Sequence, residues 1–456
     1  MARNTHVTME QLADDVRAGT IDTVIVAFAD HQGRLVGKRT DADFFFDVVV
    51  EHGTENCDYL IACDLDNTPI PGFRWASYDQ GYGDMRGVVD PATLRYLPWQ
   101  QSTAVVLVDL VDVDTGSPVE VSPRRILQRQ VARAVEEGYV AMIGSEVEFV
   151  VFEQSYDAAH RGGYRDLTPG SPFVEDYDIL QTTKQEELLG VIRRGLRGAG
   201  FPLEFSKGEA ARGQHEVNLT YQPAVESADM NLVFKTAVKE IAAASGRSAT
   251  FMAKPHIDDA GSSCHIHSSL WSHDGDSLMA GKDGHDMTDL FRWYLGGLMA
   301  TAREFSLLVA PNVNSYKRFL PESWAPTAVA WDTDNRTLGF RVVGHGRGMR
   351  VESRIPGADA NPYHAFAATI AGGLHGIRNR TEPPARYDGN GYSAPDLPRI
   401  PPTFVDAIEL WRNSEVAREC FGDDVHHHVL RHAEFEWQAF NATITDWERR
   451  RYFERI

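Results

Sequence analysis

Apolar runs rich in β-branched residues predict strands in the first hundred residues of the chain. The runs at 24–28 (VIVAF) and 104–113 (AVVLVDLVDV) are typical of buried strands, and a short helix is expected over 9–18. The polar sequence DTGSP then interrupts the pattern. We therefore place a domain boundary there, with a small mixed domain over 1–115 and a larger domain over 116–456.

The larger domain mixes helical and strand patterns without regular alternation. One helix is expected to begin at Ser122 and Pro123, as N-cap and first helical residue, and a capping box of Thr183 and Glu186 predicts another that ends at Gly200. Further helices are expected over 225–245, 287–309, 361–376, 403–417 and 428–453, and strands over 141–152, 201–206, 214–221, 263–270, 326–331, 338–343 and 349–355. Because strands and helices do not alternate with glycine-rich phosphate loops, the pattern predicts an α+β fold with a largely antiparallel sheet.

The composition excludes several classes of protein. Of 456 residues, 43% are hydrophobic and 24% are charged, which is ordinary for a globular protein. The 45 basic and 65 acidic residues give a net charge of −20, whereas nucleic-acid-binding proteins concentrate lysine and arginine. The four cysteines lack CxxC spacing, the segment MARNTHVTMEQLADD lacks an apolar signal-peptide core, and no run reaches the ~20 apolar residues of a membrane span. We expect a cytoplasmic protein with neither nucleic acid nor membrane among its partners.

Charged side chains recur on one face of the predicted strands of the larger domain, and their neighbours in sequence are apolar. These residues are Glu146, Glu148, Glu209, Glu216, His265, His267, Glu352 and Arg354. A single pair of this kind is common on a solvated sheet face, but five carboxylates on neighbouring strands repel one another unless cations lie between them. Oxygen ligands with one imidazole favour Mg²⁺ or Mn²⁺, and several metals facing arginines indicate phosphate chemistry.

The motifs that contain these residues resemble those of glutamine synthetases, in the same order and over nearly the whole chain. They are GYGDM (81–85), DPATLRYLPW (90–99), GSEVEF (144–149), the run from Glu209 to Glu216, KPHIDDAGSSCHIHSSLW (254–271), NSYKRFLP (314–321), DNRTLGFRV (334–342) and RVESRIPGADANPYHAFAA (350–368). The resemblance implies an N-terminal β-grasp-like domain and a catalytic domain with a curved antiparallel sheet flanked by helices. It also implies a dodecamer of two hexameric rings, with active sites between neighbouring subunits.

The resemblance further implies a role for each matched residue. Two or more Mg²⁺ or Mn²⁺ ions are expected per site, one held by Glu148, Glu209 and Glu216 and a second by Glu146, His265 and Glu352. The nucleotide-contacting positions are Glu204, His267, Ser269, Arg341 and Arg350, and the glutamate-binding positions are Gly261, Arg318 and Arg354. Arg336 matches the arginine that neutralises the phosphoryl group, and Asp84 matches the aspartate that a neighbouring subunit offers to the incoming nitrogen.

The implied reaction uses ATP as co-substrate and proceeds in two steps. The γ-carboxylate of glutamate attacks the γ-phosphorus of ATP, which gives γ-glutamyl phosphate and ADP. A nitrogen nucleophile then displaces phosphate. Metals and arginines are needed because a carboxylate must approach several negatively charged oxygens.

Two departures from the family pattern concern the pocket of the nitrogen donor. Where ammonium-using enzymes continue the NSYKR motif as LVPGYEAP, this chain reads FLPESWAP, which places Trp324 at the position of the pocket glutamate, with Glu322 two residues away. Where the family has NGSGMH, this chain has AGSSCH, which keeps Gly261 but loses an asparagine. An indole offers an apolar wall, an N–H donor and a cation–π contact of about 0.5–2 kcal/mol, which suits an amine that carries carbon.

The sequence therefore favours an ATP-dependent γ-glutamyl–amine ligase whose partners are glutamate, ATP and a small primary amine, with ethanolamine preferred. A polyamine as nucleophile and an ordinary ammonium-using synthetase, in which Asp84 alone serves deprotonation, remain alternatives. A catalytically inactive structural relative is disfavoured, because such a protein has no reason to retain costly buried charges.

Two further features receive no catalytic role. We expect the triplet from His426 to His428 to lie at the surface or in an interface, because successive residues of a helix face different directions. Tyr392 lies where some bacterial family members carry an adenylylated tyrosine, but the surrounding motif is absent, so we predict no such regulation.

Overall fold

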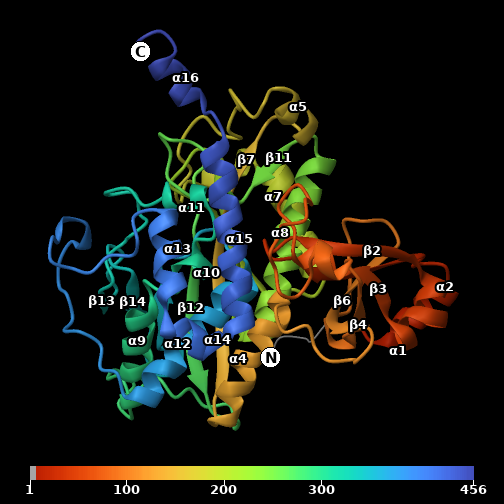
Figure 1. The fold of residues 1–456 in the computed structure, drawn as a ribbon, viewed down its shortest axis with the longest axis horizontal. Coiled ribbons are helices and arrows are strands. Elements are labelled where there is room, and N and C mark those ends of the chain that lie inside the picture. The colour runs from red at the N-terminus through yellow and green to blue at the C-terminus, as the bar shows by residue number, and fades with distance from the viewer. Residues whose placement is uncertain (1–6) are drawn as a thin grey trace.

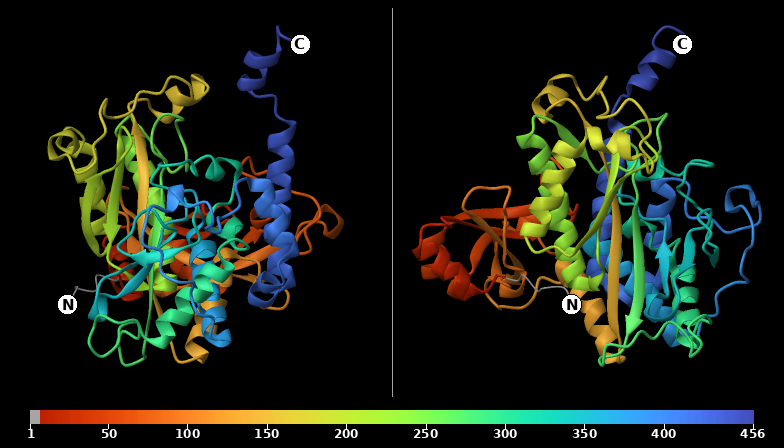
Figure 2. Two further views of the ribbon diagram at one scale, coloured as in Figure 1. Left: turned by 90° about the vertical axis from the view of Figure 1, so that its left-hand side faces the viewer. Right: turned by 180° about the vertical axis from the view of Figure 1, so that it is seen from behind.

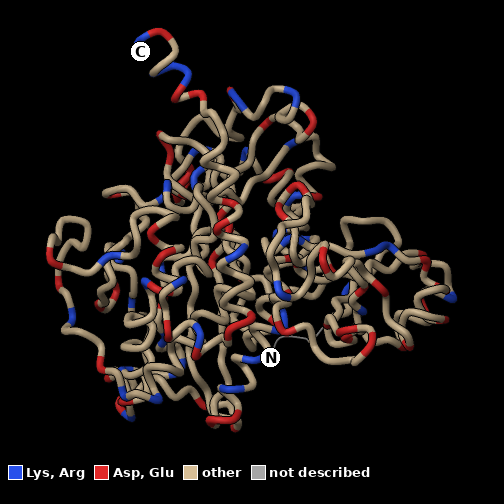
Figure 3. Tube along the Cα trace, viewed as in Figure 1, with Lys and Arg blue, Asp and Glu red and all other residues tan. Residues whose placement is uncertain are grey.

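The computed structural model describes residues 7–456 and shows a small domain beside a larger one (Figure 1). Residues 1–6, the start of the segment predicted not to be a signal peptide, lie outside the described residues. Among the described residues, the helices are all too short or too polar to cross a membrane. In the view of Figure 3, basic and acidic residues are interspersed along the chain.

The small domain is built on a six-stranded sheet in the order β2-β1-β6-β4-β3, with β5 paired to β6. Its elements are α1 (Met9–Arg17), β1 (Thr23–Ala29), β2 (Leu35–Asp41), α2 (Ala42–Phe44), α3 (Val50–His52), β3 (Thr54–Cys57), β4 (Asp84–Val89), β5 (Arg95–Tyr96) and β6 (Thr103–Asp112). The β1–β2 hairpin is antiparallel, whereas β1 and β6 run parallel. Both predicted strands are present, in a mixed sheet of the β-grasp-like kind.

The large domain is built on a nine-stranded sheet in the order β13-β14-β15-β12-β7-β9-β8, with β10 and β11 also paired to β7. The strands are β7 (Val140–Phe152), β8 (Leu203–Gly208), β9 (Gln214–Leu219), β10 (Gln222–Pro223), β11 (Ser248–Thr250), β12 (Cys264–Trp271), β13 (Trp331–Thr333), β14 (Phe340–Val343) and β15 (Arg350–Ser353). Among the described strands of this sheet, only β13 and β14 pair in parallel, so the largely antiparallel sheet is confirmed.

Helices cover one face of this sheet, as the side views of Figure 2 show. The helices of the large domain are α4 (Pro123–Glu136), α5 (Tyr156–Arg161), α6 (Ile179–Lys184), α7 (Glu186–Gly198), α8 (Ala224–Ala244), α9 (Asp289–Thr301), α10 (Ser306–Val309), α11 (Val313–Tyr316), α12 (Pro362–Asn379), α13 (Phe404–Asn413), α14 (Glu415–Phe421), α15 (Asp423–Ala442) and α16 (Asp446–Tyr452), of which α16 projects away from the sheet (Figure 1). On β7, Val147, Phe149 and Val151 are buried in the apolar core beneath these helices. Because side chains alternate along a strand, Glu146 and Glu148 project to the opposite face.

The predicted capping box at Thr183 is wrong. Thr183 lies inside α6, where its hydroxyl donates to the carbonyl oxygen of Ile179 at 2.6 Å. The N-cap of α6 is Asp178, whose carboxylate accepts from the backbone N–H of Gln181. Since Asp178 already begins a helix five residues earlier, α7 starts at Glu186 without a side-chain cap.

Three long helices of the sequence prediction are interrupted. The stretch 287–309 breaks between α9 and α10, where Phe305 turns to pack against Trp411 and Phe421. The stretch 403–417 breaks at Ser414, which caps α14. The helix predicted over 428–453 instead begins at 423 and ends at 442, and Thr445 and Glu448 then form a capping box for α16.

The strand predicted over 326–331 is also wrong, because β13 starts at Trp331 and the preceding backbone instead contacts residues 398–400.

The histidine triplet is expected at the surface or in an interface, but His426 and His428 are buried, so a surface position is wrong for these two members. The ring of His426 stacks on Trp411 with 5.3 Å between ring centroids, and its Nε2 lies 2.7 Å from the Trp411 carbonyl oxygen. His428 instead faces Ile61 of the small domain. Tertiary packing of α15 against two neighbours decides these positions.

Candidate active site

Cross-strand register brings three predicted metal ligands together. Glu148 on β7 is directly opposite Glu216 on β9, and Glu209 follows β8, the other neighbour of β9. A carboxylate oxygen from each of the three lies within 4.8 Å of the others. Burial and the neighbouring Glu209 raise the pKa of Glu148 to about 8, and burial with Glu146 and Glu209 raises the pKa of Glu216 to about 10. Lys207 offsets part of this repulsion, with its Nζ 2.6 Å from Glu209.

A second cluster of predicted metal ligands lies two residues away along β7, at Glu146. His265 on β12 is directly opposite Glu146, and its Nδ1 is 3.2 Å from Glu146 Oε2 and 3.6 Å from Glu352 Oε1. Burial lowers the pKa of His265 to about 4, so its imidazole is neutral at pH 7. Burial alone would raise the pKa of Glu352, but the neighbouring His265 and the positive charge of Arg354 lower it to about 2. One neutral nitrogen therefore faces two ionised carboxylates.

His267 also reaches this second cluster, since one of its ring nitrogens lies within 4.8 Å of carboxylate oxygens of Glu146 and Glu352. However, its Nδ1 accepts from Arg350 Nε at 3.0 Å, so its Nε2 carries the proton and donates to Glu146 Oε1 at 2.9 Å. Both nitrogens of His267 are thus engaged, whereas His265 Nε2 is buried without a partner. Both imidazoles therefore lie beside Glu146 and Glu352, and His265 stays the expected ligand because its Nδ1 is 3.2 and 3.6 Å from the two carboxylates.

The residues of both clusters fit divalent cations. Most of the donor atoms are carboxylate oxygens, one imidazole nitrogen joins them, and no cysteine lies in either cluster. This set of donors suits Mg²⁺ or Mn²⁺ better than a zinc ion held by thiolates. In the first cluster, three carboxylates face a single lysine, and a cation would relieve the repulsion that helps to raise the pKa values of Glu148 and Glu216.

Two buried arginines lie beside the metal clusters. Arg318, which is 1% exposed, donates from Nη1 to the Ile355 carbonyl oxygen at 2.8 Å and from Nη2 to Ser263 Oγ at 2.7 Å. Arg354 Nη1 is 2.5 Å from Glu352. The Nε atoms of both arginines are buried without a partner, so each keeps a donor for an anion. Gly261 permits this packing, because a Cβ there would lie 2.6 Å from Arg318 Cγ.

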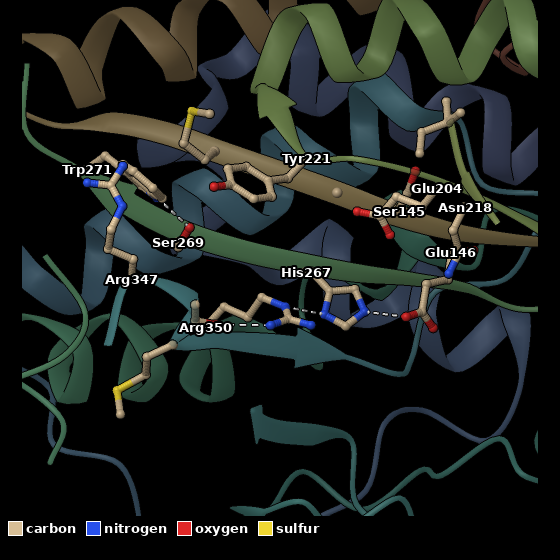
Figure 4. A pocket seen from close by; sticks show the side chains of 15 residues that line it. Ser145, Glu146, Glu204, Asn218, Tyr221, His267, Ser269, Trp271, Arg347 and Arg350 are labelled. Carbon is tan, nitrogen blue, oxygen red and sulfur yellow. Dashed lines mark hydrogen bonds and ion pairs between the residues drawn. The ribbon is translucent and has the colours of Figure 1, made fainter. Parts of the chain in front are cut away.

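Four of the five predicted nucleotide residues line a hollow of about 200 Å³ (Figure 4). Glu204, His267, Ser269 and Arg350 all line it. Arg341 lies outside its lining and instead bridges Asp334 and Glu352, with Nη1 2.8 Å from Glu352 Oε2. The hollow therefore opens towards the second cluster through Glu146 and His267.

Sequence reasoning missed the aromatic wall of this hollow. Trp271 and Tyr221 have ring centroids 5.8 Å apart, and the Arg347 guanidinium lies 4.7 Å from the Trp271 ring centroid. The Trp271 Nε1–H donates to Ser269 Oγ at 2.9 Å. Trp271 ends the recognised CHIHSSLW run, so alternation along β12 was the signal that could have identified it, whereas nothing local marks Tyr221.

Within the single chain, three of the predicted site residues do not join the clusters described above. Asp84 is exposed at the start of β4 in the small domain, opposite Cys57. Arg336 is exposed in the loop before β14, where its charge adds to the Arg341 hydrogen bond that chiefly lowers the pKa of Asp334. Trp324 is 57% exposed, in a loop where both it and Glu322 adopt positive φ values of 60° and 56°.

Tyr392 lies near the two buried arginines, a position that the sequence did not indicate. Its hydroxyl is buried without a hydrogen-bond partner. Burial raises its pKa, while the charges of Arg354 and Arg318 and the backbone amide of Trp324 lower it, which places the hydroxyl beside these three groups. The turn 391–393 carries it there through tertiary packing alone.

Comparison with known proteins agrees with this geometry. The family model described as glutamine synthetase, catalytic domain, matches residues 120–452. The chain is 50% identical over 448 residues to gamma-glutamylethanolamide synthetase GlnA4 of Streptomyces coelicolor, covering 98% of this chain and 96% of that protein. It is 34% identical over 450 residues to the glutamate–isopropylamine ligase of a Pseudomonas species, covering 98% of each. A solved GmaS–ADP complex matches with a TM-score of 0.85 at 27% identity, covering 98% of this chain and 100% of that one. The chain belongs to the glutamine synthetase family.

Proposed function

We propose that this protein is an ATP-dependent ligase that joins the γ-carboxylate of glutamate to a small primary amine, with ethanolamine favoured. The observation that carries the proposal is the loop after Arg318, which has an indole, Trp324, where ammonium-using relatives carry a carboxylate. The two relatives named above are designated by ethanolamine and isopropylamine, both small primary amines, and this supports the assignment.

ATP would occupy the hollow of Figure 4, with its base against the aromatic wall of Tyr221 and Trp271 and its phosphates towards Arg350 and His267. Glu148, Glu209 and Glu216 would hold one Mg²⁺ or Mn²⁺, and Glu146, His265 and Glu352 a second. Such cations supply charge neutralisation between the phosphates and the attacking carboxylate. Arg336 and Arg341 would add positive charge on the side of the γ-phosphate.

Glutamate would bind between the hollow and the loop. The unpartnered Nε atoms of Arg318 and Arg354 offer charge-assisted hydrogen bonds to its α-carboxylate, and Gly261 leaves room for its main chain. Held in this way, the γ-carboxylate points towards the second metal cluster, attacks the γ-phosphorus of ATP and releases ADP. The resulting γ-glutamyl phosphate is the acyl donor.

The amine would enter on the side of Trp324 and Tyr392. The indole face can hold the ammonium form by a cation–π contact, and the Tyr392 hydroxyl, which lacks a partner, can bind a hydroxyl such as that of ethanolamine. Asp84 is exposed in its own chain, so it would act in the site of a neighbouring subunit of a dodecamer, where it holds or deprotonates the amine. The free amine then attacks the acyl carbon and phosphate leaves.

The experiment is phosphate release with ATP, Mg²⁺ and glutamate against a panel of ammonium, ethanolamine, isopropylamine and putrescine. We expect ethanolamine to give the highest kcat/KM, and the Asp84→Ala variant to slow every amine. Fastest release with putrescine would replace the ethanolamine assignment by a polyamine, and fastest release with ammonium would refute the amine-ligase proposal. Absence of release with every donor would indicate an inactive relative.

A further inference from the structure

Four imidazoles gather far from the active site, between the small domain and the C-terminal helices. His31 lies in the turn between β1 and β2, His364 in the first turn of α12, and His428 and His432 one turn apart on α15. The His31 ring centroid is 3.6 Å from that of His432, 4.9 Å from that of His364 and 5.5 Å from that of His428. Phe73 covers the group, with ring centroids 4.6 and 4.7 Å from the two α15 histidines.

Hydrogen bonds fix which nitrogens of the α15 histidines are free. His428 Nε2 and His432 Nε2 lie 2.9 and 3.1 Å from the same acceptor, the carbonyl oxygen of Ile61. Since a carbonyl only accepts, both rings carry their proton on Nε2, and each Nδ1 keeps a lone pair. Metal-binding histidines are oriented in this way, with the second ring N–H donated to a backbone carbonyl.

Each of the other two histidines has a buried ring nitrogen without a hydrogen-bond partner. His31 Nδ1 and His364 Nε2 are buried without a hydrogen-bond partner, and His364 is only 3% exposed. Leaving such a group unpaired costs about 1–3 kcal/mol, so each orphaned nitrogen calls for a ligand. His31 is held in place, because Asn361 Nδ2 donates to its carbonyl oxygen at 3.0 Å.

We propose that His31, His428 and His432 form a site for a transition-metal ion of the zinc class, with His364 as the neighbouring fourth donor. One nitrogen of each of the first three already lies within 4.8 Å of the others. Two nitrogens that bind one Zn²⁺ at ~2.0–2.1 Å are at most about 4 Å apart, so binding requires a rotation of the stacked His31 ring. Burial lowers the pKa of all four imidazoles, to about 3 for His428 and about 4 for His364, so they are neutral and competent ligands at pH 7.

This site differs in chemistry from the catalytic centre. The catalytic clusters offer mainly carboxylate oxygens, which suit Mg²⁺ or Mn²⁺, whereas the histidine cluster offers imidazole nitrogens, which suit Zn²⁺, Cu²⁺ or Ni²⁺. A bound ion would tie the β1–β2 turn of the small domain to α15, and so fix the two domains to each other. The proposal does not depend on which amine the enzyme uses.

The test is the zinc content of intact protein that has been stripped with a chelator, incubated with Zn²⁺ and excess Mg²⁺, and then desalted. Mass-spectrometric metal analysis should find one more zinc per chain in wild type than in His432→Gln or in His31→Gln, which comes from the other domain. The matched control is His427→Gln on the same helix, which should keep the wild-type content. Thermal unfolding verifies that each variant is folded, and Zn²⁺ should raise the wild-type Tm but not that of His31→Gln.

Equal zinc content in wild type and both cluster variants would overturn the proposal and leave a water molecule as the partner of the orphaned nitrogens. Loss of zinc in the His427→Gln control would also overturn it, because that side chain is outside the cluster. Neither readout involves turnover, so failure here is distinguishable from failure of the proposed ligase activity.

Discussion

The two halves of the active site are built on different kinds of structure. The half that handles phosphate lies on neighbouring strands, where register alone pairs Glu148 with Glu216 and Glu146 with His265. The half proposed to receive the nitrogen donor lies on a loop with two residues at positive φ, and the proposal has Asp84 come from another subunit. The comparison suggests that the fold fixes phosphoryl transfer and leaves the choice of nucleophile to the loop, which can change without disturbing the sheet.

The largest effect is expected from the phosphate half. Replacing Glu148 or Glu216 by alanine removes a ligand whose cation contributes several kcal/mol to charge stabilisation, and each ~1.4 kcal/mol is tenfold in rate. Phosphate release should therefore fall about a thousandfold or more with every amine, while size-exclusion chromatography shows the assembly unchanged. Full activity in either variant would remove the metal assignment.

The next largest effect distinguishes the residues that bind glutamate from those that bind ATP within that half. Arg318→Ala removes charge-assisted hydrogen bonds worth about 1.5–3 kcal/mol, so the KM for glutamate should rise roughly tenfold to a hundredfold. Arg354→Ala should do the same and also lower kcat, because Arg354 contacts Glu352. The matched control is Arg347→Ala, which should raise the KM for ATP instead, since Arg347 lines the nucleotide hollow. A raised ATP KM in Arg318→Ala with an unchanged glutamate KM would mean that the roles are misassigned.

A smaller effect should appear on the loop and only in the choice of amine. Trp324→Glu restores the carboxylate of ammonium-using relatives and removes a cation–π contact of about 0.5–2 kcal/mol, so the preference for ethanolamine over ammonium should drop roughly twofold to thirtyfold. Trp324→Phe keeps an aromatic ring and is the control.

Tyr392→Phe should weaken the binding of ethanolamine but leave the binding of isopropylamine unchanged, because only ethanolamine has a hydroxyl to bind. A change in the glutamate KM with no change in amine preference would contradict the division between the two halves.

The sequence could predict one half of the site better than the other, because one half is built on strands and the other on a loop. Alternation along β7 and β12 predicted which face Glu146, Glu148 and His265 share, because a strand has a fixed period. The loop could be recognised only as a departure from a motif, since nothing local sets its backbone. Tyr392 and the partner of His428 could not be predicted at all, because segments distant in sequence bring them into place.

A separate effect is on stability and concerns metal removal. Glu148 and Glu216 have pKa values of about 8 and about 10 in the folded chain, above the 4.5 of an exposed glutamate, so the folded state holds more protons at neutral pH. Stability of the metal-free protein should therefore fall as pH rises from 7 to 8, by up to about 1.4 kcal/mol per unit for each group that stays protonated. The buried histidines, whose pKa values are lowered, oppose this decrease near pH 7, because an unfolded imidazole still holds part of its proton there, and their contribution fades towards pH 8.

The measurement is Tm at pH 7 and pH 8, in a chelator and in Mg²⁺. Divalent cations favour the ionised carboxylates, so Mg²⁺ should largely remove the decrease, and Glu216→Gln should reduce it in the chelator. An unchanged slope on adding Mg²⁺ would count against cation binding at this cluster.

The central claim is that the nucleophile is a carbon-bearing amine, and a direct competition tests it. Wild-type protein is supplied with ATP, Mg²⁺, glutamate and equal concentrations of ammonium and ethanolamine, and the products are weighed by mass spectrometry. We predict γ-glutamylethanolamide as the dominant product, with its rate of formation rising as the pH approaches the pKa of the amine, comparable to the ~10.4 of lysine, because the amine must lose a proton before attack. Glutamine as the dominant product would contradict the account and identify the protein as an ordinary glutamine synthetase.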